Sequence, residues 1–180
     1  VVEGGLAFSV VDAGTGQILA SRDPDTALVP ASTLKLLTAA AVLREYSGDE
    51  VLRTRASVED GVITLIGGGD MTLTEERLRT LATEAASLAT EQGADEVTVA
   101  LDDTFLVGGS NEAWGNNGPA GGWVTPTASL ALDEGWLDEE LYGPKSTTPA
   151  RDAAERFAEL HGQAGLTVTG KIAAAEAPQE

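Results

Sequence analysis

The stretch "GVITLIGGGDMTLTEERLRTLATEAASLATEQGADEVTVALDD", residues 61–103, decides the fold of most of the chain. It opens with a β-branched apolar run and closes with a second one, Asp95 to Asp103, and each predicts a strand. Between them, Thr74 to Gly93 has the spacing of an amphipathic helix, with a threonine cap and acidic residues in its first turn. Strand, helix and strand in this order predict a βαβ unit or a split version of one.

The glycine triplet Gly67 to Gly69, at the end of the first strand, invites comparison with a phosphate-binding loop. A phosphate loop of the P-loop type needs a lysine and a serine or threonine at a fixed distance after its glycines, and neither follows here. Asp70 also carries the wrong charge for cradling an anion. The sequence therefore argues against phosphate binding at this loop.

On the C-terminal side, residues 108–122 form a long glycine- and asparagine-rich loop, followed directly by Trp123. Loops of this length are often functional. Short strands are predicted within "PTASLALDEGW" and "GLTVTG", with a helix from about Pro149 to Gly162 between them. The single histidine, His161, lies near the end of that helix, where a histidine commonly meets the carbonyl end of the helix dipole, so we expect a structural role.

On the N-terminal side, Leu6 to Val11 and Gln17 to Ala20 flank "DAGTG" and predict a β-hairpin. Pro30 favours extended geometry in the residue before it, so a helix is expected to begin at Ala31 or Ser32. From Lys35 to Tyr46 this helix has almost no polar face, which predicts burial on nearly all sides.

The composition is that of an ordinary folded protein and excludes several functions. The 180 residues are 42% apolar and 22% charged, with no apolar run long enough to cross a bilayer. The formal net charge of −18 repels phosphate backbones, so we expect no nucleic-acid partner. Without cysteine there is no thiol nucleophile, disulfide or thiolate metal site. Chymotrypsin-type catalysis would have to depend on His161 alone, which argues against it.

The start of the helix carries a pair of residues with possible chemistry, Ser32 and Lys35. Residues three apart lie on one face of a helix, so a lysine at that spacing can reach a serine oxygen. A serine is a good nucleophile only when a base removes its proton, and a lysine can be that base when burial, cations or a helix N-terminus favour its neutral form. The alternative is that Ser32 caps the helix and Lys35 is a surface residue, although a capping box would place Glu or Gln at position 35.

The longer string "LVPASTLKLLTAAAVL", residues 28–43, is preceded by "FSVVDAGTGQILASRDPD" and resembles the active-site segment of a known family. That family is the low-molecular-mass class C penicillin-binding proteins, the D-Ala-D-Ala carboxypeptidase/endopeptidase group of serine peptidase family S13. Further similar strings follow in the family's order: "GGGDMTLT", "VTVALDDTFL", "GGW", "PTASLALDEGW" and "GLTVTG". The resemblance spans about residues 6–170.

The resemblance implies a catalytic role for two residues, with Ser32 as the acyl-enzyme nucleophile and Lys35 as the proton acceptor. It also makes Trp123 a candidate for lining the substrate cleft, for which core packing or loop anchoring is the alternative. Members of the family act on peptidoglycan stem peptides, are acylated by penicillins, and need no metal or organic cofactor. The implied location is exported, in the periplasm, the cell wall or the extracellular space.

The resemblance also implies a divided, α+β fold. Residues 1–50 would be the N-terminal segment of a penicillin-recognising serine transpeptidase/β-lactamase-like domain, and residues 51–180 an inserted α/β domain. The family's SxN and KTG motifs, expected downstream of "GLTVTG", do not occur in the sequence. Three explanations stay open: the chain is a fragment, a C-terminal half lies elsewhere on the gene or on another chain, or this relative has lost the activity. A non-catalytic cell-wall binding module and a β-lactamase-like hydrolase are therefore the competing functions.

Overall fold

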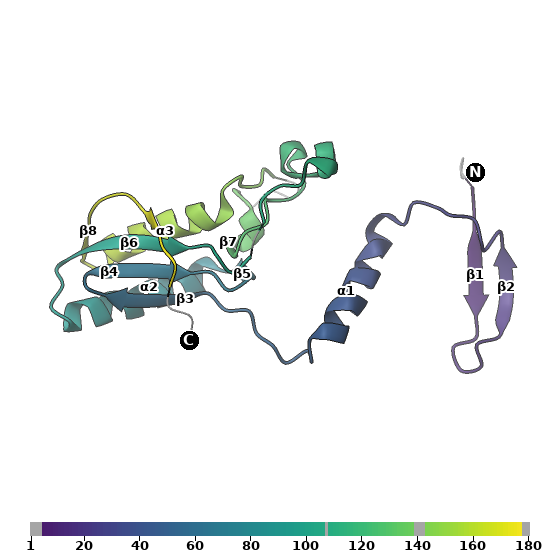
Figure 1. Ribbon diagram of the computed structural model, residues 1–180, viewed down its shortest axis with the longest axis horizontal. Coiled ribbons are helices and arrows are strands. Elements are labelled where there is room, and N and C mark those ends of the chain that lie inside the picture. Colours follow the sequence, from purple (N-terminus) through teal and green to yellow (C-terminus); the bar gives the residue numbers. More distant parts are fainter. Residues whose placement is uncertain (1–4, 107, 139–142, 178–180) are drawn as a thin grey trace. The chain divides into compact units, whose positions relative to one another are not determined.

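The computed structural model describes residues 5–106, 108–138 and 143–177 (Figure 1). It divides the chain into two compact units, Val1–Glu50 and Val51–Glu180, here called unit 1 and unit 2. The mixture of helices and strands agrees with the predicted α+β class. None of the helices in the described ranges is long and apolar enough to span a bilayer.

Unit 1 begins with the predicted hairpin, which the structure confirms. Strands β1 (Phe8–Val11) and β2 (Ile18–Arg22) pair antiparallel, with a register shift at the end of β1. Asp12 closes the turn, because its Oδ1 accepts hydrogen bonds from Thr15 N and Thr15 Oγ1, both at 2.7 Å. These bonds from Thr15 lower the pKa of the Asp12 carboxyl.

The helix of unit 1 begins where the sequence predicts, as a short 3₁₀ turn, η1 (Ala31–Thr33), that continues into α1 (Leu34–Glu45). The predicted burial of this helix is wrong: α1 has no buried residue, and Leu36 is 72% exposed. The reason is physical, since one hairpin is too small to form a second layer over a helix that is apolar on all sides. Within residues 5–50, only Ala7 and Asp12 are even partly buried.

Unit 2 is built on the predicted parallel pair. Strand β4 (Val62–Ile66) pairs parallel with β6 (Glu96–Asp102), and α2 (Glu75–Glu91) lies between them in the chain. The unit is a split βαβ, as expected, because β5 (Asp70–Leu73) precedes the helix and pairs parallel with β7 (Leu130–Leu132) in a second small sheet. Two short strands extend the main sheet beyond β6, namely β8 (Thr167–Val168) and β9 (Ala173–Ala174).

The edge strand β3 (Arg55–Glu59) was not predicted from the sequence. It pairs antiparallel with β4, and the turn between them is formed by Asp60 and Gly61, with φ of 48° and 77°. An Asp-Gly pair with two positive φ angles is a preferred two-residue hairpin turn. That dipeptide was the available signal for this strand.

The core of unit 2 lies between the sheet and two helices. Helix α2 packs on β3, helix α3 (Pro149–Gln163) packs on β6 and β8, and the two helices contact each other (Figure 1). Fully buried side chains at the centre include Ile63, Leu65, Leu78 and Phe157. Helix α3 matches its predicted range within one residue and α2 has its predicted cap, so apolar spacing and capping residues together located both helices.

An ion pair joins the start of α2 to the middle of α3. Arg156 Nη2 lies 2.6 Å from Glu75 Oε1, and Arg79 Nη2 lies 2.7 Å from the same oxygen. The hydrogen bond from Arg156 is the main cause of the lowered pKa of the Glu75 carboxyl. Glu75 therefore sits in the first turn of α2, where a negative charge is favoured, and holds a cation from each helix.

The glycine triplet serves close packing between segments. A Cβ on Gly68 would lie 2.3 Å from the backbone oxygen of Arg53, and one on Gly67 would lie 2.6 Å from Ser129 Cβ. Gly69 has a φ of +89°, a conformation that favours glycine. The three glycines therefore allow the chain between β4 and β5 to lie against the backbone at Arg53.

We predict that Gly68→Ala destabilises unit 2 by about 1–3 kcal/mol, because the new methyl group would displace the backbone at Arg53. Gly162→Ala is the matched control, since its Cβ would meet nothing within 4 Å in helix α3, and it should stabilise the unit by about 0.5–1 kcal/mol. Urea unfolding followed by circular dichroism measures both. Equal effects of the two substitutions would contradict the packing role.

His161 lies near the end of α3 as expected, but it is completely buried. Its Nδ1 lies 2.7 Å from the carbonyl oxygen of Phe157, and because a carbonyl only accepts, Nδ1 carries the proton. Nε2 is buried without a hydrogen-bond partner among the described residues. Burial lowers the pKa of His161, so the ring is neutral at pH 7 and adds no positive charge to the helix end.

We predict that unit 2 loses stability as the pH falls below about 6.5, the pKa of an unfolded histidine. Because the folded pKa is lowered, the unfolded chain binds a proton first, so stability is complete above this pH and falls by up to about 1.4 kcal/mol per pH unit below it. Urea titrations between pH 7.5 and 5 measure the slope. As His161 is the single histidine, His161→Gln should flatten the curve in this window; an unchanged slope would contradict the assignment.

Candidate active site

Ser32 lies in the 3₁₀ turn that opens the helix of unit 1, and its side chain is exposed. The hydroxyl makes no capping hydrogen bond: the cap position of α1 is Thr33, whose Oγ1 instead donates to the carbonyl oxygen of Pro30 at 2.5 Å. The capping alternative for Ser32 is therefore wrong. Its oxygen is free of hydrogen bonds within the described residues and open to an incoming group.

The residue before Ser32 has an unusual backbone conformation. Ala31 has a φ of +45°, in the left-handed region that costs a residue with a Cβ on the order of 1–2 kcal/mol. Backbone strain of this kind gathers at functional sites, where it holds a reacting group in a defined position. Ser32 is thus presented at a strained turn immediately before a regular helix.

Lys35 is the second residue of α1, three positions after Ser32, and is also exposed. Within the described residues its ammonium group makes no ion pair or hydrogen bond. The first turn of α1 contains no acidic residue, so no carboxylate compensates the helix N-terminus there. The structure places Ser32 and Lys35 at one helix start, but the described residues supply neither the burial nor the second cation that would favour a neutral, proton-accepting lysine.

Trp123 lies in unit 2, in the loop after β6, and is 64% exposed. It borders a hollow of about 470 Å³ together with Trp136, Pro144 and three glycines. Trp136 is fixed there by Lys145, whose Nζ lies 3.7 Å above the indole ring and donates to the Glu134 carbonyl at 2.9 Å. The exposure of Trp123 argues against core packing within this chain, and both loop anchoring and a place in the substrate cleft stay predictions.

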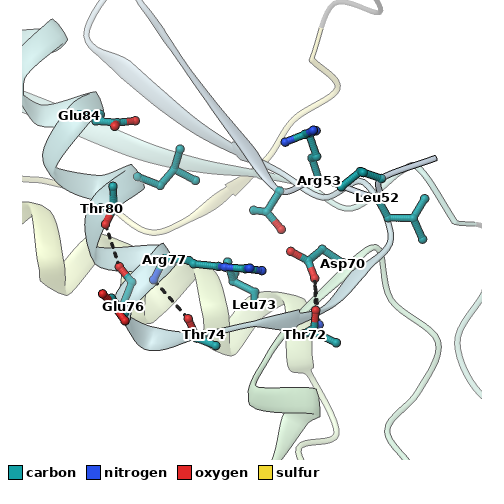
Figure 2. Close-up of a pocket in the computed structure, with 13 residues that line it drawn as sticks. Leu52, Arg53, Asp70, Thr72, Leu73, Thr74, Glu76, Arg77, Thr80 and Glu84 are labelled. Atoms are coloured by element: carbon teal, nitrogen blue, oxygen red, sulfur yellow. Dashed lines mark hydrogen bonds between the residues drawn. The ribbon is translucent and has the colours of Figure 1, made fainter. Parts of the chain in front are cut away.

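A groove of about 940 Å³ in unit 2 was not foreseen from the sequence (Figure 2). Its walls are the segment 51–54, strand β5 and one side of α2, and Arg53 and Arg77 are among the residues that line it. The helical spacing of Arg77, Thr80, Leu81 and Glu84 could have indicated a polar stripe, but not that Arg53 faces it. No group of three or more acidic or histidine side chains suited to a metal ion occurs in the described ranges.

A model of the family described as "D-Ala-D-Ala carboxypeptidase 3 (S13)" matches residues 3–146. The chain belongs to this S13 family. The match includes Ser32, Lys35 and Trp123, and it crosses from unit 1 into unit 2. The family resemblance drawn from the sequence motifs is confirmed.

Curated relatives extend well beyond the matched region. The chain is 32% identical to a D-alanyl-D-alanine carboxypeptidase of Actinomadura sp. (strain R39), over 92% of this chain and 33% of the relative. It is 30% identical to a carboxypeptidase of Mycobacterium tuberculosis (98% and 41%) and to carboxypeptidase DacB of Mycolicibacterium smegmatis (89% and 38%). The chain thus spans between a third and about two-fifths of the length of these S13 relatives.

We predict that Ser32→Ala leaves the helix population of α1 unchanged, because the lost hydroxyl makes no capping bond. Thr74→Ala is the matched comparison: Thr74 Oγ1 accepts from Arg77 N at 3.3 Å, so its loss should cost unit 2 about 1 kcal/mol. Cα secondary chemical shifts over residues 34–45 report the first effect and urea unfolding the second. A clear loss of helicity in Ser32→Ala would show that the serine caps after all.

Proposed function

We propose that this chain is the nucleophile-bearing part of an exported serine-type D-Ala-D-Ala carboxypeptidase/endopeptidase. One observation carries the proposal: an exposed serine hydroxyl without a capping role, set after a strained alanine and three residues before a lysine, in a member of the S13 family. Its substrates would be peptidoglycan stem peptides, and penicillins would acylate the same serine. The proposed location is the periplasm, the cell wall or the extracellular space.

In the proposed reaction, Ser32 Oγ attacks the carbonyl carbon of the D-Ala-D-Ala bond while its proton passes to neutral Lys35. The C–N bond then breaks, the proton is returned to the departing D-alanine amine, and an ester with Ser32 is left. A water molecule hydrolyses this acyl-enzyme and restores the serine. Backbone N–H groups at the helix start, including that of Ser32, would stabilise the oxyanion.

The proposed arrangement explains why unit 1 has no core of its own. As the first hairpin and SxxK helix of a penicillin-recognising domain, residues 1–50 would be covered by further segments of that domain, and the relatives do extend beyond the matched region. Residues 51–180 would be the inserted domain. Because burial and a second cation favour the neutral form of a lysine, which is the form that can accept a proton, Lys35 would become competent only with those parts in place, and the chain alone should be nearly inert.

We predict that benzylpenicillin forms a covalent adduct on Ser32 in the protein made from the complete gene. Mass spectrometry of the intact protein and of its peptides would locate it. Ser32→Ala should abolish the adduct, and Lys35→Ala should slow its formation by about 10²–10⁴-fold, the usual contribution of a general base. Ser21→Ala, an exposed serine on β2 of the same unit, is the matched control and should react normally.

The same experiment separates the competing functions. Rapid penicillin hydrolysis without a lasting adduct would favour a β-lactamase-like enzyme. Peptidoglycan binding that persists in Ser32→Ala, with neither adduct nor hydrolysis in the unchanged protein, would favour a non-catalytic binding module. An adduct on a residue other than Ser32 would overturn the assigned nucleophile.

A further inference from the structure

Strand β3 forms one border of the main sheet (Figure 1). The strands of that sheet follow the order β3, β4, β6 and β8, so among the described residues β3 pairs with β4 alone and its other edge is open. All five residues of β3 pair with β4 without a bulge, and the strand contains no proline or lysine. Bulges, prolines and lysines commonly protect an edge strand from pairing with another chain. Strand β3 has none of these three features.

The hydrogen bonds of β4 determine which backbone groups of β3 point to the open edge. On the β6 side, Gly61 O accepts from Thr98 N and Gly67 N donates to Asp102 O, both at 3.0 Å. Because bonding directions alternate along a strand, odd-numbered residues of β4 bond to β6 and even-numbered ones bond to β3. The partners of those even-numbered residues on β3 are Arg55, Ser57 and Glu59.

By the same alternation, the N–H and C=O groups of Ala56 and Val58 point away from β4, toward the open edge. Among the described residues, no backbone hydrogen bond outside the sheet ladders involves these two residues. Their side chains pack against the core of unit 2, which fixes the strand in place. The open edge therefore presents a rigid row of backbone donors and acceptors.

The side chains on the other face of β3 add a charge pattern. Arg55, Ser57 and Glu59 alternate with the two core-facing residues, and both charged side chains are exposed. Within the described part of the chain, neither charged residue belongs to an ion pair. They carry opposite charges at the same distance from Ser57, so the strand is complementary in charge to an antiparallel copy of itself.

An antiparallel copy centred on Ser57 satisfies the backbone and the charges together. Arg55 then lies opposite Glu59 of the second copy, and Ala56 lies opposite Val58, so that these two edge-facing residues can exchange both of their backbone hydrogen bonds. Oppositely charged residues in directly opposite positions stabilise a pair of strands.

The neighbouring registers match less well. Centring the pair on Val58 would place Arg55 opposite the turn residue Gly61. Centring it on Ala56 would place Glu59 opposite Arg53, which precedes the strand and whose backbone lies against Gly68. Only the register centred on Ser57 pairs all five residues of β3 with one another.

We propose that β3 is a self-association edge, through which two copies of the chain pair antiparallel about Ser57 and join their main sheets into one. Main-chain hydrogen bonds supply the contact, and the cross-strand charges select the register. A contact of this small size gives a weak dimer that forms as the concentration rises. The net charge of −18 on each copy opposes association, and salt at about 0.15 M screens this repulsion beyond about 8 Å. The inference does not depend on the acyl-enzyme proposal.

Amide hydrogen exchange of the ¹⁵N-labelled chain tests the ladder directly, with samples at about 20 µM and about 1 mM in about 0.15 M salt. The amides of Ala56 and Val58 should exchange at least about fivefold more slowly in the concentrated sample, because they are bonded only in the dimer. The amide of Ser57 bonds to β4 in both states, so it is the internal control and should change much less.

Charge reversal tests the register. Arg55→Glu and Glu59→Arg each place like charges opposite each other, and each should weaken the dimer at least about tenfold in sedimentation equilibrium. The double variant Arg55→Glu/Glu59→Arg restores opposite charges and should recover most of the affinity. Arg151→Glu is the matched control, because it makes the same change of charge at an exposed position on α3 and should dimerise normally.

The proposal is overturned if the chain stays monomeric at about 1 mM, or if the double variant folds but does not recover the affinity of the unchanged chain. Association without slower exchange at Ala56 and Val58 would also overturn it, since the exposed apolar surface of α1 would then be the contact. Slow exchange of both amides at every concentration would show that the edge is already covered within one chain. Ser32→Ala should dimerise normally, so this proposal and the catalytic one fail independently.

Discussion

The parallel pairing of β4 with β6 is the constraint on which unit 2 depends. Two parallel neighbours cannot be joined by a tight turn, so the chain must leave the sheet and return. Helix α2 makes that return, and its first turn is held by Thr74 and by the contact of Glu75 with Arg156. The position of α2 in turn sets the stripe from Arg77 to Glu84 beside β5. Core, ion pair and groove thus follow from one crossover.

The parts of the fold that the sequence predicted are those decided by local rules. Thr74 caps a helix with regular apolar spacing, and the runs ending at Ile66 and Asp102 are strands because their side chains suit a sheet. Strand β3 was missed because its alternation is weak, although the Asp60–Gly61 turn was a usable sign of it. Contacts between distant segments, such as Arg53 with the groove or His161 inside the core, follow from tertiary packing and have no local signal.

In the candidate site too, some features follow from local sequence and others from the folded structure. The spacing of Ser32 and Lys35 on one helix is a local property, and the sequence located both correctly at the start of α1. Neither the positive φ of Ala31 nor the free hydroxyl could be read from residue types, because alanine rarely adopts that conformation and serine is a common cap. The prediction that α1 is buried was wrong for a related reason. The sequence of a helix that is apolar on every side indicates that other segments pack around it, but does not identify those segments.

The exposed apolar surface of α1 also matters while the protein is being synthesised. Synthesis proceeds from the N-terminus, so Leu36, Leu37 and Leu43 are made before any residue of unit 2. At about 5–20 residues per second, residues 51–180 take roughly 7–26 s to make. During that interval the helix lacks all of unit 2, and the regular structure described before it in the chain is a two-stranded hairpin. The segment that carries the proposed nucleophile is therefore also the part of the nascent chain most open to wrong association before folding is complete.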